Sequence, residues 1–297
     1  MAKVVVVVTV LNEVETVDEL IRALKSQTVR PTEIIIVDGG STDGTLEKLR
    51  KYSGLKILSQ PGNRSVGRNF GVNKTRSPLI AFTDAGCIPN KDWLKELIKP
   101  FAQKEVQVVS GYYKGLPKNA FEKCLVPYVL VMPDKIPGEF WPASRSMALT
   151  SSVWIASGGF NPNLWHNEDY EFAHRLKKLG YNFIFAPEAV VGWQPRQNLS
   201  QAAWMFLRFA IGDMQARIWR PKVKLLMIRY YAFFFLVFIT PWTWVLTIPY
   251  LVWAIWKNYK YVKDPRAFFW LPILQLTSDI MVLFGSIVGL LSTAAKV

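Results

Sequence analysis

The chain has 297 residues, 51% of them hydrophobic, and a formal net charge of +14 at pH 7. This length allows one large domain or one domain with an appendage. The basic balance suggests nucleic acid, anionic lipid or a polyanionic small substrate as a partner. No zinc-finger spacing or aromatic-plus-basic single-strand reader occurs in the sequence, so we expect no nucleic-acid partner. The two cysteines, Cys87 and Cys124, provide no disulfide framework or metal motif and fit a reduced, cytosolic setting.

Strand-like and helix-like segments alternate through the first hundred residues. Runs of β-branched residues predict strands, and apolar residues at i, i+3, i+4 and i+7 predict helices. The expected strands are residues 4–9, 33–37, 55–58 and 79–83, and the expected helices are residues 17–24, 45–52, 63–73 and 91–101. Such a series predicts a parallel sheet with helices on both faces. Ligands of these sheets bind beyond the carboxyl ends of the strands, which directs attention to loops 10–13, 38–44 and 83–88.

The second half of the chain has a less regular pattern. The expected strands there are residues 107–115, 144–150, 182–187 and 189–194. Residues 168–179 should form a helix with Asn167 as its N-cap and Gly180 just past its end, and Asn90 should cap the helix at 91–101. Residues 199–219 should form a long helix rich in aromatic residues, which fits either a membrane surface or packing against the domain.

Two apolar segments follow a cluster of basic residues, and such a cluster is attracted to an anionic leaflet. Residues 230–256 carry no charge and would reach about 40 Å as one helix. That exceeds a hydrocarbon core of roughly 30 Å, so the segment must tilt, extend into the headgroups, or break at Pro241 or Pro249. Residues 267–295 carry one charge, Asp279, which should have a packing or oligomer contact or serve a lipid carrier.

The simplest interpretation of these segments is a transmembrane hairpin with the N-terminal part in the cytosol. The basic loop 257–266 would then lie outside, against the positive-inside tendency. A first segment that re-enters the same side would remove this conflict.

Two aspartates stand at the ends of expected strands. Asp38 is followed by two glycines, so its carboxylate could accept a hydrogen bond from a base while the backbone approaches a ligand closely. A tight turn with Asp43 as a helix cap explains the same residues. The stretch is neither a P-loop nor a dinucleotide fingerprint. Asp84 ends another strand, but Gly86 stands where a second carboxylate would help to hold a metal-bound diphosphate.

Together these stretches resemble glycosyltransferase family 2. The resemblance rests on VVVVVTVLNE, EIIIVDGGSTDGT, GNRSVGRNFGVNKTRSPLIAFTDAG, SGGFN and NEDYEFAHRLKKLGY, which occur in family order over about residues 3–195. It implies an inverting enzyme with a GT-A fold, an α/β Rossmann-like mixed sheet with helices on both faces. The C-terminal transmembrane helices expected from the apolar segments would follow this fold. We therefore expect a cytosolic catalytic domain over residues 1–197, an amphipathic surface helix and basic linker over 198–228, and the transmembrane hairpin over 229–297.

The resemblance also implies roles for individual residues. Asp38 would bind the base, Arg68 would line the nucleotide pocket and offer its guanidinium to a phosphate, and Asp169 would be the catalytic base. The remaining nucleotide-contacting residues would be Thr9, Leu11, Asn12, Glu13, Gly40 and Asp84. The residues near the sugar or acceptor would be Gly158, Gly159, Phe160 and Glu168, with Arg145 either touching an acceptor phosphate or forming a surface salt bridge.

In the family the second aspartate of a D-x-D motif commonly ligates Mg²⁺ or Mn²⁺. With Gly86 in that place, either Asp84 is the main protein ligand, or diphosphate and water hold most of the ion, which Mg²⁺ tolerates. Metal dependence is therefore expected but weakened.

The predicted reaction is transfer from a nucleotide-diphospho-sugar, with uridine favoured over guanosine, to a membrane-associated hydroxyl. An ionised polyprenyl phosphate needs no base, so Glu168 and Asp169 favour a hydroxyl acceptor. The alternatives are a polyprenyl-phosphate sugar synthase and a non-catalytic nucleotide-sugar-binding membrane module. The expected location is the cell membrane, multi-pass, with a cytoplasmic catalytic domain and homo-oligomer contacts through the membrane segments.

Overall fold

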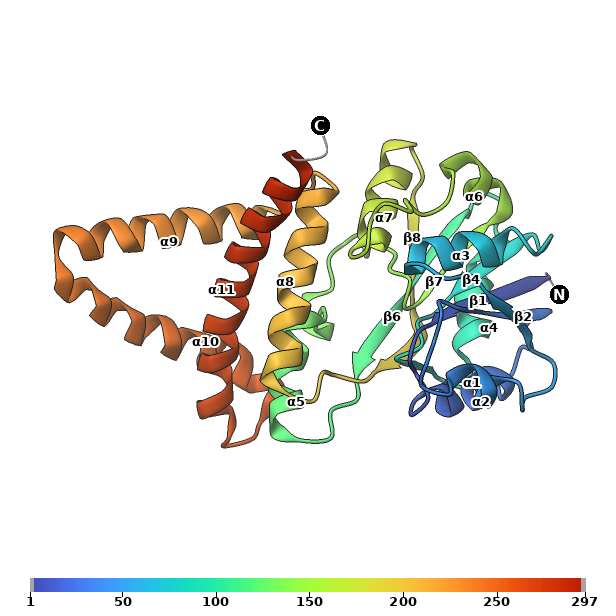
Figure 1. Ribbon diagram of the computed structural model, residues 1–297, viewed down its shortest axis with the longest axis horizontal. Helices are drawn as coiled ribbons and strands as arrows, with labels where there is room; N and C mark the ends of the chain where they lie inside the picture. The colour runs from blue at the N-terminus through green and yellow to red at the C-terminus, as the bar shows by residue number, and fades with distance from the viewer. Residues whose placement is uncertain (1–2, 295–297) are drawn as a thin grey trace. The chain divides into compact units, whose positions relative to one another are not determined.

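The computed structural model describes residues 3–294 and divides the chain into two compact units (Figure 1). Unit 1 comprises Met1–Lys114 and Pro133–Gln194, and unit 2 comprises Gly115–Met132 and Pro195–Val297. Residues 115–132, expected in the first domain, group with the C-terminal helices because their helix α5 (Ala120–Val129) packs against α10 (Thr247–Val262) and α11 (Ala267–Ala294). Residues 1–2 and 295–297, the ends of the first and last predicted domains, lie outside the described residues.

The first half of the unit 1 sheet is parallel, as the alternating pattern predicts. Its strands are β1 (Val4–Val10), β2 (Glu33–Asp38), β3 (Lys56–Ser59) and β4 (Leu79–Phe82), in the order β3-β2-β1-β4. Val5 and Val7 of β1 belong to the same buried cluster as Phe82 and Phe172, while Val4, Val6 and Val8 are equally buried. An unbroken run of buried valines is what a parallel strand covered on both faces requires.

Antiparallel strands complete this sheet beyond β4. These are β5 (Cys87–Pro89), β6 (Val108–Gly115), β7 (Met147–Thr150) and β8 (Phe183–Trp193), and the full order is β3-β2-β1-β4-β7-β6-β8-β5. The structure differs from the expectation at β8, which is one strand running through Pro187, and at β5, which the sequence did not reveal. β5 pairs only with residues 191–193, at the C-terminal end of β8. Pro187 lies outside this pairing, so its missing amide hydrogen removes no hydrogen bond to β5.

Helices cover both faces of the sheet (Figure 1). They are α1 (Val17–Lys25), α2 (Thr45–Leu49), α3 (Arg64–Val72), α4 (Trp93–Ile98), α6 (Ser151–Ser157) and α7 (Glu168–Lys178), with 3₁₀ turns at Lys99–Ala102 and Pro133–Lys135. Gly180 has a φ of +88° just past α7, as predicted. The expected side-chain caps at Asn90 and Asn167 are wrong, because α4 begins after Asp92 and the Asn167 side chain makes no capping bond.

Two glycines bring α3 unusually close to the sheet. A Cβ on Gly67 would lie 2.7 Å from Thr9 Cγ2, and one on Gly71 would lie 2.8 Å from Val7 Cγ1. Real side chains do not tolerate such distances, so only glycine permits this approach. The close contact places Arg68, between the two glycines, beside the ends of the parallel strands.

Unit 2 consists of helices only among its described residues. They are α5 (Ala120–Val129), α8 (Leu199–Gln215), α9 (Pro221–Ile239), α10 (Thr247–Val262) and α11 (Ala267–Ala294), with the 3₁₀ turn η3 (Pro241–Leu246). α8 packs along α11, where Gly285 and Gly289 allow the approach: a Cβ on Gly285 would lie 2.5 Å from the Leu207 carbonyl oxygen. The helix expected at 199–219 thus packs against α11 within unit 2, and the choice between a membrane surface and the catalytic domain stays a prediction.

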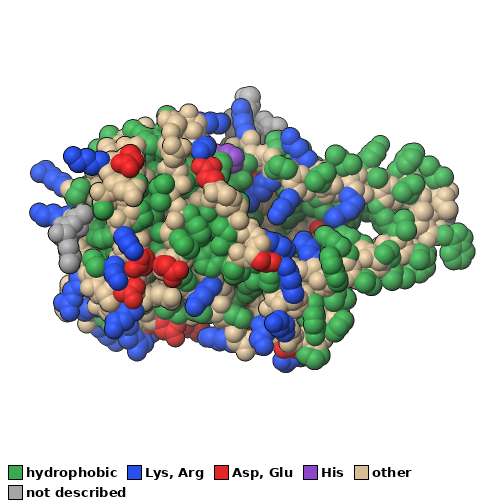
Figure 2. All heavy atoms as spheres, turned by 180° about the vertical axis from the view of Figure 1, so that it is seen from behind, with side chains coloured by type: hydrophobic (Ala, Val, Ile, Leu, Met, Phe, Trp, Pro, Cys, Tyr) green, Lys and Arg blue, Asp and Glu red, His purple; other side chains and the backbone are tan. Residues whose placement is uncertain are grey.

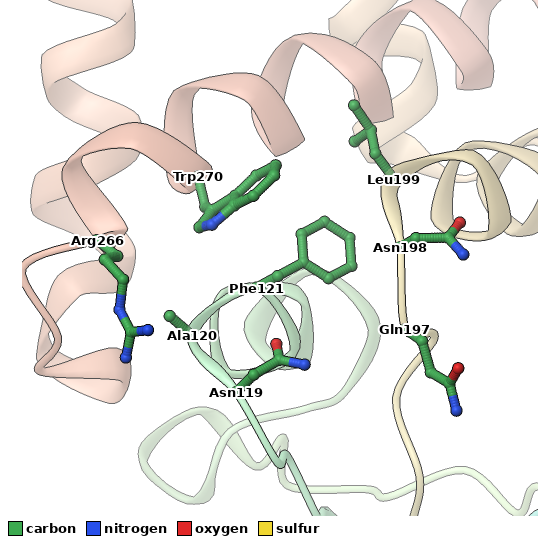
Figure 3. A pocket seen from close by; sticks show the side chains of 8 residues that line it. All are labelled: Asn119, Ala120, Phe121, Gln197, Asn198, Leu199, Arg266 and Trp270. Atoms are coloured by element: carbon green, nitrogen blue, oxygen red, sulfur yellow. The ribbon is translucent and has the colours of Figure 1, made fainter.

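A pocket of about 300 Å³ lies inside unit 2, at the N-terminal ends of α5, α8 and α11 (Figure 3). Phe121 and Trp270 form an aromatic wall, with ring centroids 5.0 Å apart. Asn119 and Asn198 on the rim cap their own helices by accepting from backbone amides. One first-turn amide of each helix, that of Glu122 in α5 and that of Gln201 in α8, therefore already has a partner here.

The apolar segment 230–256 does not form one spanning helix. α9 ends at Ile239, η3 turns at Pro241, and α10 leads back, so the break falls at one of the two predicted prolines. In the described part of the chain one helix is long and apolar enough to cross a membrane, Ala267–Ser292 with mean hydropathy 1.8. The multi-pass hairpin expected from the sequence is therefore not what the structure supports.

Asp279 has helix-packing partners. It lies on α11 and is almost fully buried. It accepts hydrogen bonds from Arg229 Nη2 at 3.1 Å and Tyr230 Oη at 2.9 Å, both on α9, and from Tyr250 Oη at 2.5 Å on α10. One carboxylate thus joins three helices, which agrees with the packing alternative for this residue.

Candidate active site

The loops after β1 and β2 are tied together by short hydrogen bonds. Asn12 has a φ of +55°, its amide donates to Ser41 Oγ at 2.9 Å, and its side-chain oxygen accepts from the Thr42 amide at 2.9 Å. The Glu13 amide donates to Thr45 Oγ1 at 2.8 Å. Leu11 stays exposed between them. The structure therefore brings loops 10–13 and 38–44 together at one edge of the sheet, as adjacent parallel strands require.

Asp38 shapes the turn that follows it. Its carboxylate accepts from the Gly40 amide at 3.0 Å and from the Ser41 amide at 3.1 Å, and it is 2% exposed. Gly40 has a φ of +102°, a conformation that favours glycine. The tight-turn interpretation thus describes this loop as it stands, and any base contact by Asp38 is additional to that role.

Arg68 is the centre of a buried ion network. The side chain is fully buried, Nη1 lies 2.6 Å from Glu168 Oε1, and Nη2 lies 2.7 Å from Asp84 Oδ1. The guanidinium also lies over the Phe160 ring, 5.1 Å from its centroid. Burial opposes the charge, but Asp84 and Glu168 outweigh it and raise the pKa of Arg68.

This placement differs from the role expected for Arg68. Both terminal nitrogens already bind carboxylates, and no surface of the side chain is open to a ligand. In this structure Arg68 therefore holds Asp84 and Glu168 in place, and its role toward a phosphate stays a prediction. The reason lies in Gly67 and Gly71, which let α3 approach the sheet so closely that the arginine between them is covered.

Ser144 joins the two aspartates that the sequence placed on donor and acceptor sides. Its hydroxyl lies 3.2 Å from Asp84 Oδ1 and 3.3 Å from Asp169 Oδ2, and its amide donates to Asp169 Oδ2 at 3.2 Å. The hydroxyl also accepts from Arg68 Nη2 at 2.9 Å. A hydroxyl carries one proton, so it donates to only one of the two carboxylates at a time.

Three arginines act on Asp84. Burial alone would raise the pKa of its carboxyl, but the charges of Arg68, Arg64 and Arg145 hold that pKa below its usual value. Arg64 is exposed at the start of α3. Arg145 lies over the rings of Tyr113 and Trp193, at 5.5 and 5.7 Å from their centroids. Its guanidinium therefore contacts aromatic rings where a surface salt bridge was the alternative. Positive charge thus surrounds the end of β4.

The loop of Gly158, Gly159 and Phe160 is fixed to α3. The Asn69 side chain accepts from the Phe160 amide at 2.9 Å and donates to the Phe160 carbonyl at 2.7 Å. Both glycines have a φ of +73°. Phe160 itself is buried in the core, so its ring packs against the Arg68 guanidinium and is not exposed to a ligand.

The end of β4 fits a divalent cation only in part. Among the described residues no group of three His, Cys, Asp or Glu side chains could hold a metal. Asp84 uses Oδ1 for Arg68 and Ser144, and no hydrogen bond to its Oδ2 is found in the part of the chain that the structure describes. A Cβ on Gly86 would meet nothing within 4 Å. The donor set is one carboxylate oxygen, which suits an ion held chiefly by diphosphate and water.

Sequence reasoning missed Ser144 and Asn69. Neither belongs to a recognisable motif, and serine is common in loops and turns of any function. Asn69 does follow Arg68 in the GRN stretch, so its position could have drawn attention, but its partner lies 91 residues away. Both contacts depend on tertiary structure that no local pattern reveals.

Comparisons with known proteins agree with this architecture. The family model described as Glycosyl transferase family 2 matches residues 5–125. Glycosyltransferase AglE of Haloferax volcanii is 26% identical over 231 residues, which is 72% of this chain and 73% of that protein. Dodecaprenyl-phosphate galacturonate synthase of Rhizobium johnstonii is 24% identical over 207 residues, which is 66% of this chain and 56% of that protein.

A solved structure resembles the fold. The mannosyltransferase PcManGT from Pyrobaculum calidifontis, in complex with GDP-Man and Mn²⁺, superposes with a TM-score of 0.62 over 97% of this chain and 87% of that one, at 18% identity. The likeness confirms the GT-A fold expected from the sequence. Residues 5–125 match the model of glycosyltransferase family 2, and the relatives found by sequence are glycosyltransferases, which supports placing this chain in that family.

Proposed function

We propose that this glycosyltransferase moves a sugar from a nucleotide-diphospho-sugar to a hydroxyl of a membrane-associated acceptor, such as a lipid-linked glycan, a glycolipid or a surface polysaccharide, with inversion. The observation that carries the proposal is the junction at Ser144, whose hydroxyl lies within 3.3 Å of both Asp84 and Asp169. It supports a site in which a strand-end carboxylate on the donor side and a helix-start carboxylate on the acceptor side act on the same sugar.

Asp169 is the catalytic base in this proposal. It removes the proton from the acceptor hydroxyl as that oxygen attacks the anomeric carbon, and the bond to the diphosphate breaks on the opposite face. Ser144 and the Tyr170 amide hold the Asp169 carboxylate by hydrogen bonds, which fixes its direction. Glu168 does not touch the reactants, because it is paired with buried Arg68.

Positive charge near Asp84 stabilises the leaving diphosphate. Because Arg68 is covered, we assign the phosphate-facing role to Arg64 and Arg145, the other two arginines whose charges act on Asp84. Mg²⁺ or Mn²⁺, when bound, would supply further charge at the same place, held by Asp84 Oδ2. The loops carrying Thr9, Leu11, Asn12, Glu13, Asp38 and Gly40 would receive the nucleoside.

The donor base is expected to be uracil from the family resemblance, whereas PcManGT was solved with GDP-Man. A screen must therefore contain both UDP-sugars and GDP-sugars. Purified protein is incubated with each donor and with either a total lipid extract or polyprenyl phosphate alone. Release of nucleoside diphosphate and entry of labelled sugar into the lipid phase are measured, with and without chelator.

Asp169→Asn tests the proposed base, with Glu171→Gln on the same helix turn as the matched control. We expect Asp169→Asn to lower turnover by about 10²–10⁴-fold while donor binding persists, and Glu171→Gln to stay near wild type. Wild-type turnover in Asp169→Asn would contradict the proposal.

A polyprenyl-phosphate sugar synthase is the second candidate, because the Rhizobium johnstonii relative carries that kind of name. An ionised phosphate acceptor needs no general base. Efficient product from polyprenyl phosphate alone, insensitive to Asp169→Asn, would favour this candidate over a hydroxyl acceptor. Strong product from the lipid extract and none from polyprenyl phosphate would favour the first.

A further inference from the structure

A helical arm of unit 2 exposes large hydrophobic side chains among its described residues. It consists of α9 beyond Arg229, the turn η3, and α10 up to Lys257, and Figure 2 shows it as an extension covered by hydrophobic side chains. The exposed large hydrophobic residues on it include Tyr231, Phe234, Phe235, Leu236, Phe238, Ile239, Trp242, Trp244, Ile248, Val252 and Trp256. Such an area exceeds what a soluble protein surface normally leaves in water.

The exposed apolar surface covers more than one face of the arm. Exposed hydrophobic residues occupy the consecutive positions 234, 235 and 236 of α9, and again 238 and 239. Consecutive residues of an α-helix point about 100° apart, so these side chains cannot share one face. A protein partner or a second copy docking on one side would leave the rest in water. A hydrocarbon environment accounts for all sides at once.

Charges gather only where the arm begins and ends. Residues 230–256 contain no Asp, Glu, Lys, Arg or His, whereas Lys222, Lys224 and Arg229 precede them and Lys257 and Lys260 follow them. Figure 2 shows basic side chains around the root of the extension. Tyr231 and Trp256 add exposed aromatic rings there, as at a membrane interface. This order fits anionic headgroups at the root and acyl chains at the tip.

The reach of the arm sets its depth. Arg229 to Ile239 spans ten helical rises, or about 15 Å, and Thr247 to Lys257 gives the same length. A bilayer's hydrocarbon core is about 30 Å thick. The Asp279 junction holds Arg229 and Tyr230 at the root of α9, and Tyr250 within α10, to α11, so the arm cannot slide inward on its own. The uncharged arm thus reaches about the bilayer midplane.

The turn at the tip meets the requirement of a nonpolar medium that backbone groups find partners internally. The Thr240 amide donates to the Leu236 carbonyl at 2.8 Å, and the Thr243 amide and hydroxyl both donate to the Thr240 carbonyl. The Thr247 hydroxyl donates to the Trp244 carbonyl at 2.6 Å. Prolines 241 and 249 have no amide hydrogen to satisfy.

We infer that α9–η3–α10 is a re-entrant membrane anchor that inserts into one leaflet of an anionic bilayer and returns to the side it came from. The basic loop 257–266 then stays on the same face as Lys222 and Lys224, which removes the conflict with the positive-inside tendency. This inference concerns attachment and does not depend on the reaction proposed above.

Single-cysteine reporters test the depth. Burial, with a smaller effect of nearby Asp84 and Asp264 respectively, raises the pKa of the Cys87 and Cys124 thiols to about 12, so a new cysteine is the reactive one. Phe238→Cys and Lys257→Cys are each labelled with an environment-sensitive fluorophore. The full chain is then bound to sealed phosphatidylcholine–phosphatidylglycerol vesicles containing lipids brominated at defined depths, with iodide added outside or trapped inside.

We expect the label at 238 to be quenched by lipids brominated near the acyl-chain ends and by iodide on neither side. The label at 257 should be quenched by outside iodide. Quenching at 238 by trapped iodide would show that the arm spans, with Trp242 and Trp244 at the far interface, and would overturn the inference. Absence of lipid quenching at 238 would equally overturn it and point to a second copy or a protein partner.

Vesicle flotation measures how strongly the chain binds to the bilayer. Phe235→Ser combined with Phe238→Ser should lower the partition coefficient at least tenfold, whereas Ile155→Ser, an exposed hydrophobic residue of unit 1, should leave it unchanged. Lys257→Gln and Lys260→Gln should each lower binding to anionic vesicles by about fivefold and have little effect on neutral ones. Unchanged flotation of the double serine variant would contradict the inference.

Discussion

Replacing Arg68 by methionine should destabilise unit 1 strongly. The substitution keeps an apolar stem but leaves Glu168, which is 3% exposed, without its cation. Removing one partner of a buried ion pair costs about 3–5 kcal/mol. Loss of the contact with Phe160 adds about 0.5–2 kcal/mol. In a domain of about 150–250 residues each kcal/mol lowers the melting temperature by about 2–4 °C, so we expect a decrease of about 7–28 °C.

The double variant Arg68→Met with Glu168→Met separates this cause from simple loss of packing. It removes both buried charges, and Asp84 keeps Arg64 and Arg145 nearby, so the loss should fall below about 2 kcal/mol. Arg64→Met, one turn earlier on α3 and exposed, should change stability by less than about 0.5 kcal/mol. Melting followed by tryptophan fluorescence measures all three. A decrease below about 1 kcal/mol in Arg68→Met, or strict additivity in the double variant, would refute the buried-network reasoning.

Three further outcomes follow from the same site. Ser144→Ala should lower kcat about tenfold or more, because it removes the hydrogen bond donated to Asp84 or Asp169 and the one accepted from Arg68, worth about 1 kcal/mol each, while the KM for the donor changes little; a raised KM with normal kcat would contradict this. Gly86→Asp should lower the Mn²⁺ concentration needed for half-maximal activity, since a Cβ there meets nothing within 4 Å, with Gly86→Asn as the uncharged control; equal effects of both would count against a metal role. The pKa of Asp84 is depressed in the folded state, so its stabilisation is present above its unfolded pKa of about 3.9 and is lost as pH falls through the lower folded value; the melting difference between wild type and Asp84→Asn should stay constant above about pH 5 and shrink below about pH 4.

The fold was predictable because local signals agree with it. Buried β-branched runs, helix periodicity and glycine-rich turns recur in the order that a parallel sheet requires, and Asp38 and Asp84 stand at strand ends where ligands bind. The ionised partners of Arg68 could not be predicted, because Glu168 lies 100 residues away. The close approach of α3 could not be predicted either, since Gly67 and Gly71 contact sheet residues that are distant in the sequence.

In the C-terminal region, the sequence predicted the apolar segment and its break but not the path of the chain after the break. Composition alone identified 230–256 as apolar and Pro241 as a candidate break, but the direction of α10 after that break depends on its contacts with α11 and on the Asp279 junction. The strand that continues through Pro187 was hidden for a similar reason, since the cost of a proline in a strand depends on which edge its nitrogen faces.

The stereochemistry of the first product tests the central claim most directly. Once a donor is found, its transfer or slow hydrolysis is followed by ¹H NMR, and the first anomer is identified before mutarotation. Direct attack by an oxygen activated by Asp169 predicts a configuration opposite to that of the donor. A first product with the donor's own configuration would contradict the assignment of Asp169 as base and of the site built around Ser144.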